Sequence, residues 1–325
     1  MSERTFDSSS FEKFNYALRP AKNVERKMFC EAFARLSRIG SMASFRYIGF
    51  GAIGFHDFCL FHERLGIRDM LSIEGNTSAQ ERVEKNIPYS CIQMEWGLSH
   101  DILPQLEWKK RTILWLDYEW PLNRRMLDDV RCAVANMVSG SVIVVTLPVN
   151  SGLPSGTEVA QSKRMNDLEE SVGKERITSE IRAIPLAKWG LASVSRKIVI
   201  NQIESTLLDR NAPQDDDRRI TFRQLFNFQY ADGIKMMTVG GILLDDTDRE
   251  KMGADLFDDL EFYRSGSDAY LIESPVLTLR EIAALNAMLP GSLPDVSELV
   301  WIPEAERRKY GKVYRYYPSF SEVES

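Results

Sequence analysis

The chain has 325 residues, of which 44% are hydrophobic and 27% are charged, and this composition excludes wholesale disorder, a collagen-like chain and a long coiled coil. The formal net charge is −6, because 41 basic residues stand against 47 acidic ones. Residues 1–150 contain 19 basic and 18 acidic residues and residues 151–325 contain 22 and 29, so a general nucleic-acid clamp, which needs surplus cations, is not favoured.

The cysteines and histidines show no metal-ligand spacing. Cys30, Cys59, Cys91 and Cys132 form no Cys-x-x-Cys pair, and the three histidines form no HExxH motif, so no metal is expected. Free thiols are typical of a reducing compartment. The first residues lack the apolar run of a signal peptide, and no apolar run reaches the ~20 residues that span a bilayer. We therefore expect a cytoplasmic protein without a membrane segment.

Between residues 20 and 150, short apolar segments alternate with amphipathic ones. Five strands that alternate with helices predict a parallel α/β sheet. The predicted strands are 45–50, 69–74, 89–96, 111–117 and 141–147, and the predicted helices are 20–40, 55–65, 78–87, 98–106 and 122–138.

This regularity stops near Asn150. The later pattern predicts helices over 158–210, a β-hairpin over 222–245, an acidic helix or loop over 247–265 and a helix over 278–289. We expect an α/β fold with a Rossmann-type, mainly parallel sheet, an N-terminal helix, and a C-terminal helical and β-hairpin elaboration. The predicted divisions are a flexible segment over 1–19, the Rossmann-type domain over 20–150, and the elaboration or second domain over 151–325.

The strongest motif is Gly49-Phe-Gly51-Ala-Ile-Gly54, which follows a predicted strand and opens a predicted helix. Glycines allow a tight turn and a close approach to a ligand, and the helix then offers free N–H groups. Glu74 ends the next strand, where a carboxylate can accept both hydroxyls of a ribose. The motif predicts either a dinucleotide or S-adenosylmethionine; the alternative is a tight strand-to-helix turn that holds no ligand.

The ordered set of glycine loop, strand-end acid, Glu95-Trp96-Gly97 and Asp117-Tyr-Glu119 resembles the Rossmann-type S-adenosylmethionine-dependent methyltransferases over about residues 20–150. The resemblance implies that the glycine loop binds the methionine part of the cofactor and that the acid after the second strand binds the ribose. It further implies that the segment after the third strand flanks the adenine and that the acid ending the fourth strand faces the sulfonium or the substrate. The implied cofactor residues are Gly49, Gly51, Gly54, Glu74, Glu95, Trp96, Gly97 and Ser99.

Asp117 and Glu119 are the candidate catalytic residues. Both lie at the carboxyl end of a predicted central strand, where open α/β sheets bind ligands. A carboxylate there can deprotonate a hydroxyl or bind a divalent cation, and the alternative is that Asp117 only caps the next backbone segment. The Asn/Asp-Pro-Pro-aromatic motif of base methylation is missing, which favours an oxygen acceptor.

Three further residues are candidates for contact with the substrate or for closing the site. His56 follows the glycine loop, and Tyr16 and Arg19 precede the first strand in a segment that often covers the cofactor in the resembled family. The basic and aromatic stretches 14–27 and 307–317 would also suit single-stranded nucleic acid. We favour a solvated helix face for the first stretch, which includes Lys22 and Arg26, and an amphipathic strand for the second.

The sequence therefore predicts an S-adenosylmethionine-binding, methyltransferase-like protein with an unknown acceptor. One alternative is a non-catalytic Rossmann subunit of a larger assembly, such as a prokaryotic defence system, that binds a protein partner through its C-terminal half. A second alternative is a nicotinamide-dependent oxidoreductase. The helix before the first strand and the absence of a Tyr-x-x-x-Lys pair after the fourth strand count against this last alternative.

Overall fold

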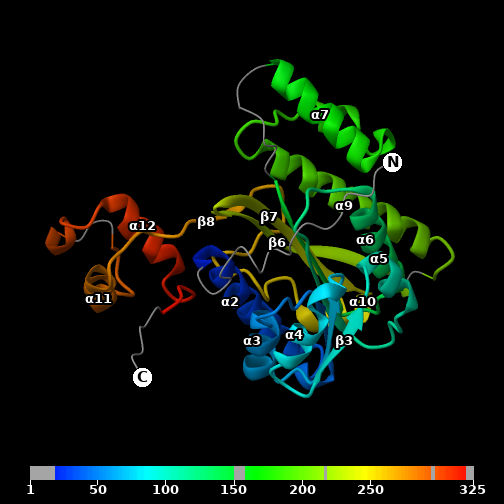
Figure 1. The fold of residues 1–325 in the computed structure, drawn as a ribbon, viewed down its shortest axis with the longest axis horizontal. Helices are drawn as coiled ribbons and strands as arrows, with labels where there is room; N and C mark the ends of the chain where they lie inside the picture. Colours follow the sequence, from blue (N-terminus) through cyan, green and yellow to red (C-terminus); the bar gives the residue numbers. More distant parts are fainter. Residues whose placement is uncertain (1–18, 150–157, 216–217, 294–296, 320–325) are drawn as a thin grey trace.

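The described residues form an eight-stranded sheet with strand order β3-β2-β1-β4-β5-β7-β6-β8 and helices on both faces (Figure 1). The computed structural model describes residues 19–149, 158–215, 218–293 and 297–319. The first five strands are mutually parallel. They are β1 (Arg46–Gly49), β2 (Asp69–Glu74), β3 (Ile92–Trp96), β4 (Thr112–Asp117) and β5 (Val142–Pro148), so the five predicted strands and the predicted α/β class are confirmed.

The predicted hairpin forms β6 (Thr221–Asp232) and β7 (Ile234–Leu244), with its turn at Gly233. It is part of the main sheet, because β7 pairs antiparallel with both β5 and β6. Nearly every residue of β7 is buried, so this strand needs a neighbour on each side. A short strand that the sequence analysis missed, β8 (Tyr270–Ile272), pairs parallel with β6. The sheet therefore continues across the boundary predicted near residue 150.

Alternate residues of the central strands face opposite cores, as the pleat of a strand requires. Tyr47, Trp115 and Val144 belong to one core, whereas Ile48 and Leu116 belong to the other. The first core is covered by α2 (Pro20–Ala34), α3 (His56–Leu65), α4 (Gln80–Lys85) and α10 (Asp246–Met252). The second is covered by α5 (Ser99–Ile102), α6 (Arg124–Asn136), α7 (Glu158–Val172), α8 (Ser179–Arg182) and α9 (Gly190–Asn211).

The helices α11 (Leu279–Met288) and α12 (Glu304–Val313) form a C-terminal module that lies to one side of the sheet, beyond α2 and β8 (Figure 1). The module has a small core of its own around Leu285, Ile302 and Tyr310. The amphipathic strand predicted for the tail is wrong, because residues 304–313 are helical. The ion pairs Glu304–Arg308 and Glu306–Lys309 link neighbouring turns of that helix.

The C-terminal module is attached to the outer end of α2. Arg315 pairs with Glu31 at 3.0 Å, Tyr316 donates to the same carboxylate, and Lys27 donates to the carbonyl of Tyr317 at 3.3 Å. Within the described ranges, no helix is both long and apolar enough to cross a bilayer.

Candidate functional site

The carboxyl ends of β1, β2 and β4 meet at one edge of the sheet. The strand order runs 3-2-1 on one side and 4-5 on the other, so the order reverses between β1 and β4. Such a reversal opens a crevice at the carboxyl ends of the strands, where open α/β sheets bind ligands. Gly49, Glu74 and Asp117 are the last residues of these three strands, so the structure brings them to the same edge.

The glycine loop between β1 and α3 differs from the expectation in how it turns. Its left-handed residues are Ala52, with φ of 44°, and Phe55, with φ of 45°, and none of the three motif glycines has a positive φ. The glycines are needed because of crowding. A Cβ atom would lie within 3 Å of the Tyr47 hydroxyl at position 49, of the Phe55 ring at position 51 and of the His56 ring at position 54. The protein's own side chains thus account for the glycines.

Glu74 stands half-buried at the end of β2. Its Oε1 accepts the backbone N–H of Asn76 at 2.8 Å. Burial raises the pKa of Glu74 above its ordinary value of 4.5, and the negative charge of Glu119 raises the pKa further. Glu119 is exposed, and because its charge acts on Glu74, it lies near Glu74 at this edge of the sheet.

The segment after β3 packs beside Glu74. Trp96 is paired with Glu74 in the parallel ladder and packs against the first core, whereas the side chain of Glu95 is exposed. Gly97 has a φ of 150°, which favours glycine, and its N–H donates to the carbonyl of Glu74 at 3.0 Å. The backbone here is fixed to the end of β2.

Ser99 is engaged with a buried carboxylate. Its hydroxyl donates to Oδ2 of Asp129 at 2.5 Å, and the hydroxyl of Tyr118 donates to the same oxygen at 2.7 Å. Burial raises the pKa of Asp129. These bonds join the segments after β3 and β4 to α6, so Ser99 already has a structural partner.

A buried lysine that the sequence analysis placed on a solvated face lies against Asp117. The side chain of Lys22 is only 1% exposed, and its Nζ lies 2.8 Å from Oδ1 of Asp117 and 2.9 Å from Oε2 of Glu25. The same Nζ donates to the Tyr230 hydroxyl at 3.2 Å and lies 4.3 Å from the centre of the Trp115 ring. A buried ammonium is stable only with such partners.

The start of α2 is held in place by the tip of the β6–β7 hairpin. The backbone N–H groups of Ala21 and Lys22 donate to the two carboxylate oxygens of Asp232 at 3.2 and 3.0 Å. A carboxylate at a helix N-terminus satisfies free N–H groups and the positive end of the helix dipole. Pairing of α2 with a distant hairpin gave no signal in the local sequence.

Arg26, one turn after Lys22, is also buried, with 8% of its surface exposed. Within the described part of the chain its Nε has no hydrogen-bond partner. Its positive charge acts on His56 and Asp57, the first two residues of α3. Tyr47 donates to the carboxylate of Asp57, and burial raises the pKa of that carboxyl group. The solvated face expected for Lys22 and Arg26 is therefore wrong.

Tyr16, Arg19 and His56, the candidates for closing the site, differ in what the structure shows of them. Tyr16 lies outside the described residues. Arg19 is half-buried at the start of α2, and its carbonyl accepts the N–H of Asn23 at 3.0 Å. His56 is exposed beside Gly54, and partial burial of its ring and the charge of Arg26 lower its pKa.

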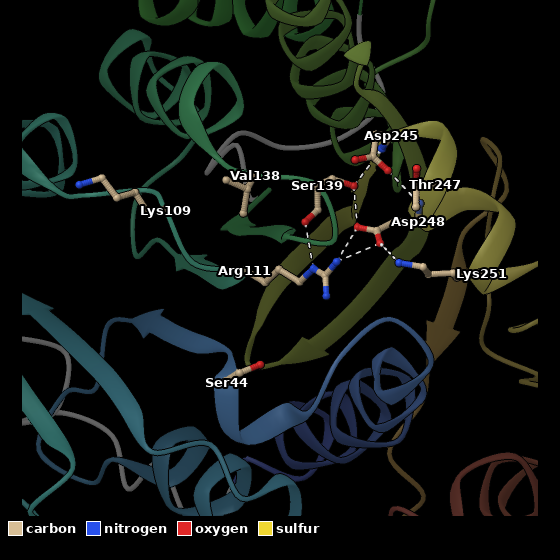
Figure 2. A pocket seen from close by; sticks show the side chains of 9 residues that line it. All are labelled: Ser44, Lys109, Arg111, Val138, Ser139, Asp245, Thr247, Asp248 and Lys251. Atoms are coloured by element: carbon tan, nitrogen blue, oxygen red, sulfur yellow. Dashed lines mark hydrogen bonds and ion pairs between the residues drawn. The ribbon is translucent and has the colours of Figure 1, made fainter. Parts of the chain in front are cut away.

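A second cluster of charges lies at the opposite, amino edge of the strands, around a pocket of about 520 Å³ (Figure 2). Arg111 donates from Nη2 to both carboxylate oxygens of Asp248 at 2.9 Å, and from Nε to the carbonyl of Ser139 at 3.2 Å. The Ser139 hydroxyl donates to Asp248 at 2.7 Å. Among residues that the structure describes, no three His, Cys, Asp or Glu side chains are placed to hold a metal ion.

Comparison with known proteins gives one family match, by a model described as "Putative O-methyltransferase", over residues 14–325. A search of curated proteins found no match. Among solved structures, Trm1 from Pyrococcus horikoshii, solved with S-adenosyl-L-methionine, has a TM-score of 0.47 and 11% identity over 76% of this chain and 58% of its own.

Two other solved structures are similar at a lower level. TYW2 from Pyrococcus horikoshii, in complex with MeSAdo, has a TM-score of 0.37 and 10% identity over 71% of this chain and 64% of its own. An rRNA methylase from Streptococcus thermophilus has a TM-score of 0.35 and 6% identity over 66% of this chain and 95% of its own. The chain thus spans less than two thirds of the lengths of Trm1 and TYW2.

Proposed function

Because the chain belongs to the O-methyltransferase family whose model matches residues 14–325, we propose that it transfers a methyl group from S-adenosylmethionine to an oxygen atom of its acceptor. The resemblance to S-adenosylmethionine-dependent methyltransferases that the sequence indicated is confirmed by this match. The acceptor, the catalytic activity and the individual site residues are parts of the proposal.

The observation that carries the proposal is the meeting of Gly49, Glu74 and Asp117 at the edge where the strand order reverses. The half-buried carboxylate of Glu74 fits a ribose, since one of its oxygens already takes a backbone N–H and its acceptors suit a pair of hydroxyls. When bound, the cofactor supplies an electrophilic methyl group on a sulfonium.

We assign the remaining cofactor contacts by position. The loop that contains Gly49, Gly51 and Gly54 precedes α3 and would hold the methionine part. The segment 95–99, whose backbone is fixed to β2 through Gly97, would flank the adenine. Arg19 and His56, at the starts of α2 and α3, would cover the bound ligands. The same role for Tyr16, which lies outside the described residues, is proposed from the sequence alone.

Asp117 is the proposed base for the acceptor hydroxyl, and Glu119 is the second candidate. An oxygen acceptor must lose its proton as it attacks the methyl group, and a positioned carboxylate can accept that proton. Lys22 fixes one oxygen of Asp117 at 2.8 Å, while the Asp117 side chain keeps 27% of its surface exposed. Lys22 is therefore a positioning residue. Much of the rate would come from alignment of the two reactants.

Calorimetric titration with S-adenosylmethionine and S-adenosylhomocysteine tests the cofactor site. We expect micromolar binding to the wild type and at least about tenfold weaker binding to Glu74→Ala, because the ribose loses a charged acceptor. Reduced nicotinamide dinucleotide, titrated alongside, should produce no heat. Folded wild-type protein that binds neither adenosyl ligand at about a millimolar contradicts the proposal, and binding of the nicotinamide would favour the oxidoreductase alternative.

Methyl transfer is tested separately with labelled S-adenosylmethionine and a panel of hydroxyl- and carboxyl-bearing acceptors. Asp117→Ala should bind S-adenosylhomocysteine with little change and lose most of the turnover, by about 10²-fold or more. A wild type that binds the cofactor and transfers no methyl group to any acceptor would favour the non-catalytic alternative. That alternative draws support from the C-terminal module, which exposes Val300 and Trp301 and would be the region that meets a protein partner.

A further inference from the structure

Within the described residues, no side chain caps the N-terminus of α3, and the carboxylate in its first turn, Asp57, is bonded to Tyr47 and to its own backbone N–H. The capping residue of α3 is Phe55, whose side chain offers no hydrogen-bond acceptor, and the helix is ten residues long. The free N–H groups of such a helix end and its positive dipole attract an anion. This feature alone does not identify a ligand, because water can satisfy exposed N–H groups equally well.

Arg26 supplies the second, independent observation. Its guanidinium belongs to α2, which packs against α3, and its charge acts on the first two residues of α3. Only 8% of the surface of Arg26 is exposed, and within the described residues its Nε donor has no partner. A buried donor without an acceptor is costly, so the position is unfavourable unless a ligand completes it.

The charges around Arg26 limit the ligand that fits there. His56 and Asp57 lie in the first turn of α3, Asp117 ends β4, and Lys22 is already paired with two carboxylates. Within the described residues, the Nε of this guanidinium has no partner. Beside two acidic groups, such a guanidinium suits a single negative charge and disfavours a phosphate dianion. A carboxylate matches the planar fork of a guanidinium and can also accept helix N–H groups.

We propose that Arg26, together with the N-terminus of α3, binds the α-carboxylate at the methionine end of the cofactor. This inference rests on the proposed function, since the same loop, 49–54, leads directly into α3. Arg26 is then a binding residue that discriminates ligands with a carboxylate from ligands that lack one. The role also accounts for a buried arginine beside a helix end that no side chain caps within the described residues.

Calorimetry with two ligands that differ in one group tests the proposal. S-adenosylmethionine carries the α-carboxylate, and decarboxylated S-adenosylmethionine lacks it and keeps the amine. For Arg26→Met we expect about 10- to 100-fold weaker binding of S-adenosylmethionine and an unchanged affinity, within about twofold, for the decarboxylated ligand. Arg26→Lys should recover part of the loss, because it restores the charge without the planar fork.

Arg38→Met is the matched control, because Arg38 is exposed just after α2 and its loss should change neither affinity. Arg26→Met and wild type must give the same circular dichroism spectrum. Equal weakening of both ligands in Arg26→Met, or no weakening of either, overturns the assignment of Arg26 and leaves the cofactor site intact. Failure of the wild type to bind either ligand overturns the proposed function and this inference together.

Discussion

The two edges of the sheet each carry an arginine near acidic groups, half-buried Arg111 at one and buried Arg26 at the other. The two arginines differ in how many of their donors have acceptors. At the amino edge, every nitrogen of Arg111 has an acceptor, on Asp248, Ser139 or Ile39. Figure 2 shows the bonds to Asp248 and Ser139. At the carboxyl edge, the Nε of Arg26 lacks an acceptor within the described residues. The amino edge has the pocket of about 520 Å³, yet its central charges already satisfy one another.

This difference shows that neither charge nor an open pocket is sufficient to identify a ligand site. A polar group whose bonding capacity is filled by its own chain contributes to stability, and a buried group with unfilled capacity is available for a ligand. We therefore expect opposite effects when the two arginines are replaced. Replacement of Arg111 should lower stability and leave ligand binding unchanged, whereas replacement of Arg26 should lower ligand binding without a loss of stability.

The largest effect is expected for Lys22 at the carboxyl edge, whose ammonium already has Glu25 and Asp117 as partners. Lys22→Met would leave Glu25, which is fully buried, without its cation and would release Asp117. Breaking a buried ion pair from one side costs about 3–5 kcal/mol of unfolding free energy. Guanidinium denaturation measures this loss directly.

Lys85 offers the matched control for that measurement. It pairs with Glu81 on the surface, where the two side chains are 73% and 83% exposed. Lys85→Met should change the unfolding free energy by less than about 0.5 kcal/mol. A loss of less than about 1 kcal/mol in Lys22→Met would mean that the buried network is not a stabilising unit.

At the amino edge, Arg111→Met should cost about 2 kcal/mol, less than the full penalty of a buried pair because Arg111 keeps 28% of its surface exposed. The remaining carboxylate of Asp248 is only 4% exposed and would keep the Ser139 hydroxyl as a donor. The affinity for S-adenosylhomocysteine should stay unchanged. A loss of that affinity in a folded variant would contradict our placement of the ligand site at the carboxyl edge.

Arg26→Met should show the opposite pattern. Removal of a buried charge without a full set of partners is neutral or stabilising, so we expect an unfolding free energy equal to or up to about 1 kcal/mol above that of the wild type. Binding should fall, as described above. Thermal denaturation with and without S-adenosylhomocysteine measures both properties in one experiment, and a clear loss of ligand-free stability would show that Arg26 has a structural role instead.

The sheet and the residues at its edge were predictable from the sequence because their signals are local. Runs of apolar residues mark parallel strands, and the carboxyl ends of such strands meet at one edge, which places Glu74 and Asp117 together. The tail was predicted wrongly because Tyr314 and Tyr316, two residues apart and separated by Arg315, read as one face of an amphipathic strand. The ion pairs that favour a helix there depend on residues three and four apart.

The buried charges were not predictable in the same way. Lys22 and Arg26 on a helix are assigned to water by default, because burial of an unpaired charge is unfavourable. Their burial depends on contacts far away in the chain, such as Tyr230 with Lys22 and Asp232 with the start of α2. Only the pairing of distant segments reveals such partners, and a single sequence contains no local signal for it.

The smallest predicted effect compares the two ends of β2. Asp69 begins this strand at the amino edge; burial opposes ionisation there, but hydrogen bonds from Lys110 and Arg46 bring its pKa below the ordinary 3.8. Glu74 ends it, and burial holds the pKa of Glu74 above the ordinary 4.5. Folding therefore favours the ionised form of Asp69 and disfavours the ionised form of Glu74.

These opposite shifts give opposite pH dependences. A lowered pKa contributes stability above pH 3.8 that is lost as the pH falls through the folded-state value, so Asp69→Asn should be less stable than wild type at pH 7, by under about 1 kcal/mol, and should approach it in acid. A raised pKa contributes stability below pH 4.5 that is lost as the pH rises through the folded-state value. Glu74→Gln should therefore equal wild type in acid and exceed it at pH 7. Urea denaturation across this pH range measures both differences, and a Glu74→Gln variant that is less stable at pH 7 would show that the fold itself, and not a ligand, uses the ionised carboxylate.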